Sequence, residues 1–271
     1  MSEINKQTLV KDLKAIGVEK GDLLHLKVSM RSVGPLKGGA DELLEAILEV
    51  VGEEGTIVSD AFVKVYPLPL SDEHKKIVAE EKTPSYAGAF SNAMIKHTGM
   101  ERSKHPVQKF AAIGTLAKQL CENHTPESGG YDLLDEMAEM DAKNLTIGGG
   151  VVGVGTTHVA IDQLGFKRKE MNAGTLYRDQ DGAVKLARVD WNGGCGRGFP
   201  KFYPLYRQKG GMLAEGKIGH ADSVLTSMKK TLEIELEKLE QSPEFFFCDD
   251  PACYSYRISW EHSPKNYLSF G

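Results

Sequence analysis

Apolar and polar residues recur with two different periods in the N-terminal part of the chain. Residues 8–16 place their apolar side chains at helical spacing, which predicts a short amphipathic helix. Residues 23–30 instead alternate, which predicts a strand. The alternation puts His25, Lys27 and Ser29 on one face of that strand and aliphatic residues on the other. A polar face on an otherwise apolar strand indicates that the strand ends at a site.

The next two elements indicate how the strands are connected. Residues 41–51 begin with acidic residues and carry an apolar stripe, which predicts a helix. Residues 56–63 form an apolar run of the kind found in buried strands. A strand, a helix and a second strand make a βαβ unit, in which the two strands are parallel. We therefore predict an α/β fold with a central, largely parallel sheet that is flanked by helices.

The pattern changes after residue 166. Residues 176–191 contain apolar runs around a turn sequence at 179–182, which predicts antiparallel strands. We place them in an antiparallel segment at about 167–192, inside a single domain that spans residues 1–271.

Two other segments carry weaker patterns. Residues 64–84 are irregular and contain Pro67 and Pro69, so they are interpreted either as an active-site loop or as partly disordered. The stretch from about Ser223 to Leu239 predicts a long amphipathic helix.

A short strand, a glycine-rich turn and the start of a helix follow one another between residues 144 and 166. Glycine lets a backbone turn sharply or approach a ligand closely. Thr156 and Thr157 supply N-cap chemistry, so His158 is expected in the first turn of a helix. The positive end of a helix favours neutral imidazole, which suits a general base. The alternative is a structural turn packed against a helix, with His158 hydrogen-bonded in the interior.

Two further places could bind a ligand. Gly38 and Gly39 precede a predicted helix, where free backbone N–H groups and the helix dipole attract an anion. A purely structural loop is the alternative there. His105 is followed by Pro106 between a predicted helix and a predicted strand, and it either lines a pocket or caps the edge of the sheet.

The composition narrows the class of function. Lys and Arg total 33 against 38 Asp and Glu, for a net charge of −5, which argues against a nucleic-acid partner. No run approaches the roughly 18 apolar residues of a membrane span, and the N-terminal segment is polar, unlike a signal peptide. Four cysteines do not make a disulfide framework, so we predict a cytoplasmic protein.

The cysteines leave two alternatives open. Cys248 and Cys253 could join a histidine in a zinc site, but no second pair follows them, so we predict no metal. Cys195 lies in a glycine-rich loop and is either an acyl-carrying nucleophile or a packed thiol.

Several motifs, taken in order over about residues 5 to 240, resemble the aminoglycoside 3-N-acetyltransferase family, also called antibiotic N-acetyltransferases. The matching stretches are Lys27-Val28-Ser29-Met30-Arg31-Ser32-Val33-Gly34, Gly38-Gly39-Ala40, Gly52-Glu53-Glu54-Gly55-Thr56-Ile57-Val58, Thr83-Pro84-Ser85-Tyr86-Ala87-Gly88-Ala89-Phe90, Arg102-Ser103-Lys104-His105-Pro106, Phe110-Ala111-Ala112-Ile113-Gly114, Ile147-Gly148-Gly149-Gly150, Thr156-Thr157-His158 and Lys217-Ile218-Gly219-His220-Ala221.

The resemblance implies transfer of an acetyl group from acetyl-CoA to an amine, possibly an aminoglycoside or amino sugar. It implies that His158 is the general base. Thr156 and Thr157 are expected to donate hydrogen bonds to the developing oxyanion, and helix geometry puts Asp162, four residues after His158, on the histidine's side. The residues expected to bind coenzyme A are Lys27, Ser29, Ser32, Val33, Gly38, Gly39, Ala40 and His105. A small-molecule amine is the expected partner, with no nucleic acid, no membrane and a possible homodimer.

The sequence also departs from the family pattern. The family's first motif histidine is replaced by Lys27 and the serine after it by Val28. The family has an acid three residues after its active-site histidine, where this chain has Ile161. A site for polycationic aminoglycosides should be lined with carboxylates, so an acceptor with fewer charges is favoured. The alternative function is a coenzyme A-binding homologue that has lost aminoglycoside acetylation.

Overall fold

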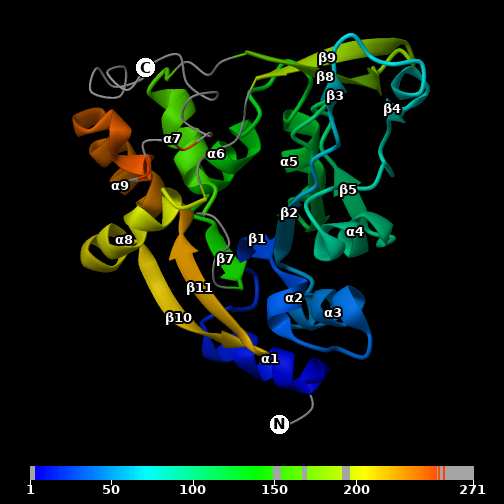
Figure 1. Cartoon of the computed structure of the whole chain (residues 1–271). Helices are drawn as coiled ribbons and strands as arrows, with labels where there is room; N and C mark the ends of the chain where they lie inside the picture. The colour runs from blue at the N-terminus through cyan, green and yellow to red at the C-terminus, as the bar shows by residue number, and fades with distance from the viewer. Residues whose placement is uncertain are drawn as a thin grey trace.

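A computed structural model describes residues 4–148, 154–166, 170–190, 196–248, 250 and 253. Its main feature is a mixed seven-stranded sheet, whose strand order is β10-β11-β7-β1-β2-β6-β5 (Figure 1). The strands are β1 (Leu23–Val28), β2 (Thr56–Asp60), β5 (Met100–Arg102), β6 (Phe110–Gly114), β7 (Lys143–Ile147), β10 (Met212–Ile218) and β11 (Ala221–Ser227).

The three central strands of this sheet are parallel. β1 pairs in parallel with β2 on one side and with β7 on the other, whereas all outer pairings are antiparallel. The predicted α/β fold, with a largely parallel centre flanked by helices, is confirmed. Because parallel strands end at the same edge of a sheet, the carboxyl ends of β1, β2 and β7 lie together.

One face of the sheet is covered by helices from the N-terminal part of the chain. They are α1 (Lys6–Ala15), α3 (Gly39–Val51) and α4 (Ala89–Lys96), with the short α2 (Met30–Val33) directly after β1. The predicted helix at 41–51 is confirmed within α3, which buries six aliphatic side chains against the sheet. The leucine, isoleucine and valine side chains among them each contribute roughly 1.5–3 kcal/mol when fully buried.

Helices from the second half of the chain cover the opposite face, together with α5. They are α5 (Ala117–Asn123), α6 (Asp132–Glu139), α7 (Thr156–Gln163), α8 (Tyr203–Lys209) and α9 (Met228–Gln241), with 3-10 turns at η2 (Phe199–Phe202) and η3 (Pro243–Phe246). Their apolar residues form one core with Val58 and Phe110 of the sheet. This packing fixes the start of α7 and the carboxyl end of β7 between the core and the other central strands.

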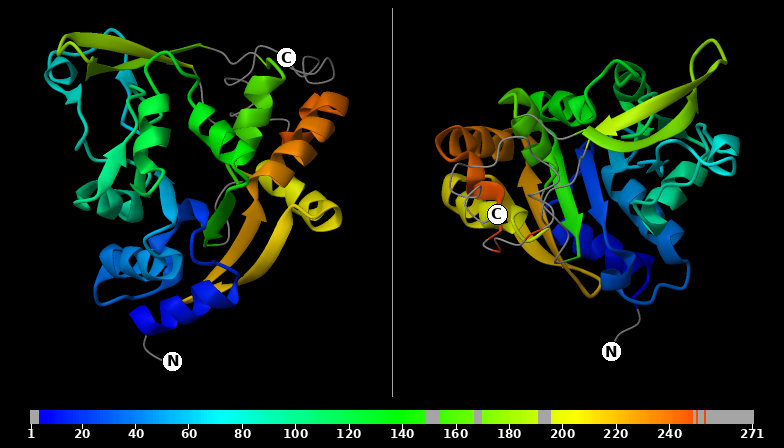
Figure 2. Two further views of the ribbon diagram at one scale, coloured as in Figure 1. Left: turned by 180° about the vertical axis from the view of Figure 1, so that it is seen from behind. Right: turned by 45° about the horizontal axis from the view of Figure 1, so that its top comes forward.

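A second, smaller sheet lies at the end of the molecule opposite α1 (Figures 1 and 2). It contains β3 (Tyr66–Pro67), β4 (Val78–Ala79), β8 (Glu170–Arg178) and β9 (Val184–Asp190), with η1 (His74–Lys76) between β3 and β4. The predicted antiparallel segment is confirmed as the β8–β9 hairpin. β8 also pairs with β3 and β4, so the irregular segment 64–84 is tied to it.

The predicted long helix from Ser223 is wrong in its first part. Residues up to Ser227 form β11, and α9 begins only at Met228, with the Ser227 side chain capping it through the Lys230 N–H. Ala221, Ser223 and Leu225 are buried at every second position. Two small residues at these core positions concealed the strand period from a hydrophobicity pattern. Within the described ranges, no helix is long and apolar enough to span a membrane.

Candidate active site

The central strands carry a buried polar cluster on the face that α7 covers. His25 is fully buried, with its Nδ1 2.9 Å from Asn144 Oδ1 and its Nε2 3.0 Å from Asp60 Oδ1. Leu26 pairs with Ser59, so Lys27 and Asp60 are the next positions along β1 and β2, and their charged atoms lie 3.8 Å apart. The predicted polar face of β1 therefore meets a carboxylate from β2.

Asp60 is ionised despite its burial. Burial by itself raises the pKa of this carboxyl, but the charge of Lys27, the hydrogen bond and charge of His25 and the charge of His158 lower it to about 2. Its side chain is 16% exposed. The cluster therefore holds a fixed negative charge at neutral pH.

The start of α7 lies directly on this cluster. The N-cap is Gly155, with φ +92°, and a Cβ at this position would lie 3.2 Å from His25 Cε1. The positive φ and this close approach both favour glycine. The prediction that Thr156 and Thr157 cap the helix is wrong, since both are helical and their hydroxyls turn to α9, where Thr156 Oγ1 lies 3.0 Å from Thr231 Oγ1.

His158 lies in the first turn of α7, as predicted. Its ring stacks on that of Tyr131, with centroids 4.3 Å apart and planes at 6°, and it meets Phe199 edge-on at 5.4 Å. Tyr131 precedes α6 and Phe199 begins η2. His158 is partly exposed, while its neighbours Thr157 and Val159 are buried. The ring is held in one orientation without being closed off.

Thr157 contacts a buried carboxyl and does not face the polar cluster. Its hydroxyl and that of Tyr206 both donate to Oε1 of Glu235, which is fully buried on α9. Among the described residues, the second oxygen of Glu235 has no hydrogen-bond partner. Burial raises the pKa of Glu235 to about 7, against the three hydroxyl groups of Thr156, Thr157 and Tyr206, which lower it. The hydroxyl predicted to face an oxyanion instead fixes α7 to α9.

We expect Glu235→Gln to make the protein more stable at about pH 8 and to leave its stability near pH 5 little changed. In the folded protein the pKa of Glu235 lies above its usual value of 4.5. The stability that the protonated carboxyl contributes is therefore complete below pH 4.5 and is lost as the pH rises through about 7. A neutral amide avoids the loss, which is on the order of 2–3 kcal/mol. The measurement is the free energy of unfolding in urea at both pH values.

Glu237→Gln is the matched control for Glu235→Gln. Glu237 lies on the same helix, pairs with Lys209 and is exposed. Its carboxyl is ionised over the whole interval, because the hydrogen bond and charge of Lys209 lower its pKa. A gain in Glu235→Gln that is the same at both pH values would contradict a titrating buried carboxyl.

The residues predicted to bind coenzyme A fall in two groups near the end of β1. Ser29 Oγ and Ser32 Oγ are 2.9 Å apart, and a Cβ on Gly148 would lie 2.7 Å from the Ser29 Cβ. Val33 is fully buried, so its side chain is a core residue, and its carbonyl accepts from the His220 N–H at 2.9 Å. The serines thus adjoin the first glycine of the turn that leads to α7.

Gly38, Gly39 and Ala40 begin α3. Gly38 is exposed and Gly39 is half-buried, and a Cβ on Gly39 would meet open space. However, the Gly38 N–H donates to Glu42 Oε2 at 2.8 Å. A carboxylate from the chain itself therefore occupies part of the predicted anion site at this helix terminus.

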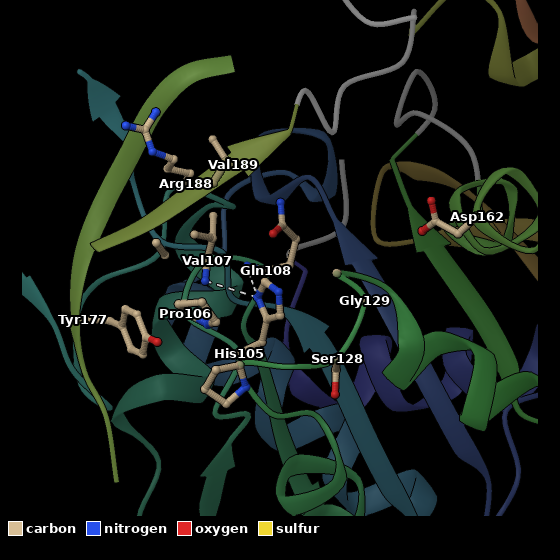
Figure 3. Close-up of a pocket in the computed structure, with 13 residues that line it drawn as sticks. His105, Pro106, Val107, Gln108, Ser128, Gly129, Asp162, Tyr177, Arg188 and Val189 are labelled. Atoms are coloured by element: carbon tan, nitrogen blue, oxygen red, sulfur yellow. Dashed lines mark hydrogen bonds between the residues drawn. The ribbon is translucent and has the colours of Figure 1, made fainter. Parts of the chain in front are cut away.

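His105 lies elsewhere, in a pocket of about 430 Å³ between β8–β9 and the loop before α6. Figure 3 shows Tyr177, Arg188 and Val189 on one side of this pocket, Asp162 on the opposite side, and His105 and Gln108 between them. The His105 Nδ1 accepts the N–H groups of Val107 and Gln108, at 3.2 and 2.9 Å. Burial, then the charges of His124 and Lys109, lower its pKa to about 3, so the ring is neutral.

Asp162 is exposed and lines this pocket, one helical turn after His158. The structure thus places His158 and Thr157 in the first turn of α7 and Lys27 in the polar cluster, whereas His105 and Asp162 line the pocket. Gly149, Gly150, Gly153 and Cys195 lie outside the described residues.

Four functional side chains were missed by sequence reasoning, namely Asp60, Tyr131, Glu235 and Tyr206. Asp60 offered one signal, since it is a charged residue inside an apolar strand. Within the described residues, no group of three or more His, Cys, Asp or Glu side chains is arranged to hold a metal ion. Cys248 and Cys253 are both buried thiols.

Comparison with known proteins decides the family. A family model described as aminoglycoside 3-N-acetyltransferase matches residues 24–240. The chain belongs to the aminoglycoside 3-N-acetyltransferase family. Aminoglycoside N(3)-acetyltransferase IV of Salmonella sp is 29% identical over 252 residues, which are 90% of each chain. Other matches are partial: aminoglycoside N(3)-acetyltransferase III of Salmonella sp is 28% identical over 131 residues, 44% of this chain and 46% of the relative, so the chain spans about half of that relative.

Solved structures of the family share the fold. A structure described as AAC-IIIb binary with CoASH superposes with a TM-score of 0.77 at 21% identity, over 89% of this chain and 97% of the other. The apoenzyme of aminoglycoside acetyltransferase AAC(3)-IVa gives 0.77 at 24% identity, over 96% and 97%. At these identities the likeness establishes the common fold.

Proposed function

We propose that this family member transfers the acetyl group of acetyl-CoA to an amine, with His158 as the general base. The observation that carries the proposal is the position of His158 in the first turn of α7, where Tyr131 and Phe199 hold a ring that stays partly exposed. A base that is fixed in orientation and still accessible can take a proton from a bound amine. Family membership and a structural neighbour described as a CoASH complex support acetyl-CoA as the donor.

The reaction needs one base and one leaving thiol. The amine nitrogen attacks the thioester carbonyl carbon and a C–N bond forms, while a ring nitrogen of His158 accepts the amine proton. The C–S bond then breaks, and coenzyme A leaves as a thiolate that takes up a proton. Thr157 serves this chemistry indirectly, because its hydroxyl bond to Glu235 holds the first turn of α7 in place.

The proposed donor site lies at Ser29, Ser32 and the start of α3. The half-buried serine hydroxyls and the open backbone at Gly39 are suited to hydrogen-bond a polar, anionic molecule. Lys27 fits this role less well than the sequence implied, because its ammonium faces Asp60 at 3.8 Å. Val33 can contribute only backbone groups, since its side chain is fully buried.

We propose that the acceptor amine enters the pocket of about 430 Å³ beside α7. Among the residues that the structure describes, its lining offers one carboxylate, Asp162, together with the phenol of Tyr177 and the guanidinium of Arg188. A polycation would favour several carboxylates. An amine with few charges, such as an amino sugar or a small metabolite, therefore suits this lining better than an aminoglycoside.

The alternative is a coenzyme A-binding homologue without acetyltransferase activity. One observation favours it, namely that Ile161 is fully buried where the family carries an acid. No carboxylate therefore stands at that position to assist the base.

The test is release of thiol from acetyl-CoA, followed with DTNB, for aminoglycosides, amino sugars and small amines. We expect amine-dependent release, with low-charge amines turned over best, and an N-acetylated product by mass spectrometry. A reaction without amine corrects for hydrolysis and for the protein's own four cysteines. If no amine is turned over while coenzyme A still raises the melting temperature, the non-catalytic alternative replaces the proposal.

A further inference from the structure

Asp60 ends β2 as a buried carboxylate, and the proposed reaction gives it no part so far. Its side chain is 16% exposed, and its two oxygens face two different side chains, with His25 Nε2 at 3.0 Å from one and Lys27 Nζ at 3.8 Å from the other. Asn144 holds the other nitrogen of His25, and Thr146 in turn holds Asn144. The carboxylate is therefore fixed by contacts from β1, and β7 supports one of them through His25.

Two independent contacts connect Asp60 to the first turn of α7. The backbone of Gly155 lies against the ring of His25, and the His158 N–H donates to the Gly155 carbonyl at 3.1 Å. On the other side, the ring of Tyr131 stacks on His158 and also contacts Phe62, whose centroid is 6.4 Å away. Phe62 lies two residues beyond Asp60 in the chain, so this second contact joins the segment that follows the carboxylate to the same imidazole.

Asp60 and His158 are also coupled electrostatically. The charge of His158 is one of the causes that lower the pKa of Asp60, after Lys27 and His25. Because a coupling free energy is reciprocal, the Asp60 carboxylate stabilises protonated His158 by the same amount. Lys27, with the opposite charge, destabilises it.

Other titratable groups face this region from each neighbouring element. Tyr131 stacks on His158 from the start of α6, Glu235 lies behind Thr157 on α9, and Asp162 is one turn further along α7. Tyr86 lies near Asp60, and partial burial followed by the Asp60 charge raises its pKa. Of these groups, only Asp162 is a carboxylate on the same helix as His158. Its side chain is exposed and lines the pocket.

We propose that Asp60 is the positioning residue for His158. It supports His158 through the start of α7, and its charge stabilises the imidazolium that forms when His158 has accepted the amine proton. Asp60 itself takes no proton in this step and stays a carboxylate throughout. The charge of Lys27 and the hydrogen bond with His25 keep it ionised. The inference rests on the proposed function. It assigns a supporting carboxylate to the base, although an isoleucine stands at position 161, where the family has an acid.

The test is an NMR titration of His158 in the ligand-free protein, with labelled histidine and with His158→Gln to assign its signal among the eight histidines. We expect Asp60→Asn to lower the titration midpoint of His158 by about half to one pH unit, because a partly buried opposite charge is lost. We expect Lys27→Met to move the midpoint upward, because a like charge is lost.

Midpoint shifts of opposite sign in the two variants distinguish charge coupling from a change in structure. Asp22→Asn is the matched control, since Asp22 is a half-buried carboxylate paired with Lys143 at the other end of the sheet, and it should leave the midpoint unchanged. No shift in Asp60→Asn, or shifts of the same sign in both variants, overturns the proposal. Lys27→Met carries the test alone if Asp60→Asn does not fold, and an unchanged or lowered midpoint then overturns it.

The activity measurement distinguishes this inference from the proposed function. If acetyl transfer occurs, the acidic limb of the kcat/KM profile should shift with the NMR midpoint in Asp60→Asn. Opposite NMR shifts in a protein that acetylates no amine would uphold the Asp60–His158 coupling and overturn the acetyltransferase proposal.

Discussion

We expect His158→Gln to lower kcat/KM for acetyl transfer by about 10²- to 10⁴-fold, which is the usual contribution of a general base. Glutamine keeps much of the volume between Tyr131 and Phe199 and can still form hydrogen bonds, but it cannot accept the amine proton. The loss should therefore appear in kcat, with little change in melting temperature or in the affinity for coenzyme A. The measurement is the DTNB assay with the best amine of the panel.

His97→Gln is the control for this experiment, because His97 follows α4 on the opposite face of the sheet. It should retain the wild-type rate. In the wild-type enzyme, kcat/KM should rise with pH along an acidic limb as His158 loses its proton. A His158→Gln enzyme with more than about one tenth of wild-type activity would argue that His158 has only a structural role.

Arg102→Met is expected to destabilise the protein by about 3–5 kcal/mol. The Arg102 side chain is buried, and its guanidinium donates to the carbonyl oxygens of Glu81, Thr83 and Ala61. Methionine fills a similar volume but leaves three acceptors without their charged donor. The measurement is the free energy of unfolding in urea at neutral pH.

Two further variants make the Arg102 experiment specific. Burial lowers the pKa of Arg102 to about 10 against the charge of Glu81, so the residue is still charged at neutral pH. Arg102→Lys keeps the charge with fewer donors and should lie between methionine and the wild type. Arg207→Met removes an exposed partner of Glu215 and should cost less than about 1 kcal/mol. A similar cost for both methionine variants would contradict the role given to Arg102.

The Arg102 contacts also explain part of the motif that carries the family resemblance. Ser103 Oγ accepts the Phe110 N–H at 2.9 Å, and His105 accepts two backbone N–H groups. In the connection from β5 to β6, these two side chains accept backbone N–H groups in place of main-chain carbonyls. Arg102 in addition holds the end of β2 in place, next to Asp60. The motif is thus largely structural, although His105 also lines the pocket.

Local patterns were sufficient for the elements whose partners are close in sequence or whose period is strong. The acidic start and apolar stripe of 41–51 specified α3, and the turn at 179–182 specified the β8–β9 hairpin. Alternation in β1 correctly grouped His25 with Lys27. The strand before the glycine-rich stretch and the helix that carries His158 were also predicted, since each depends only on neighbouring residues.

Only the tertiary structure determined what surrounds His158. Asp60 meets Lys27 because β1 and β2 are parallel neighbours in one particular register, and that register depends on a packed core and not on local sequence. Thr157 faces Glu235 because α9 packs on α7, 78 residues further along the chain. The β10–β11 hairpin was hidden because a serine occupies one of its core positions. The sequence by itself determined the family, most elements and the candidate base, whereas the position of Asp60 against His25 and Lys27 follows from contacts between distant strands.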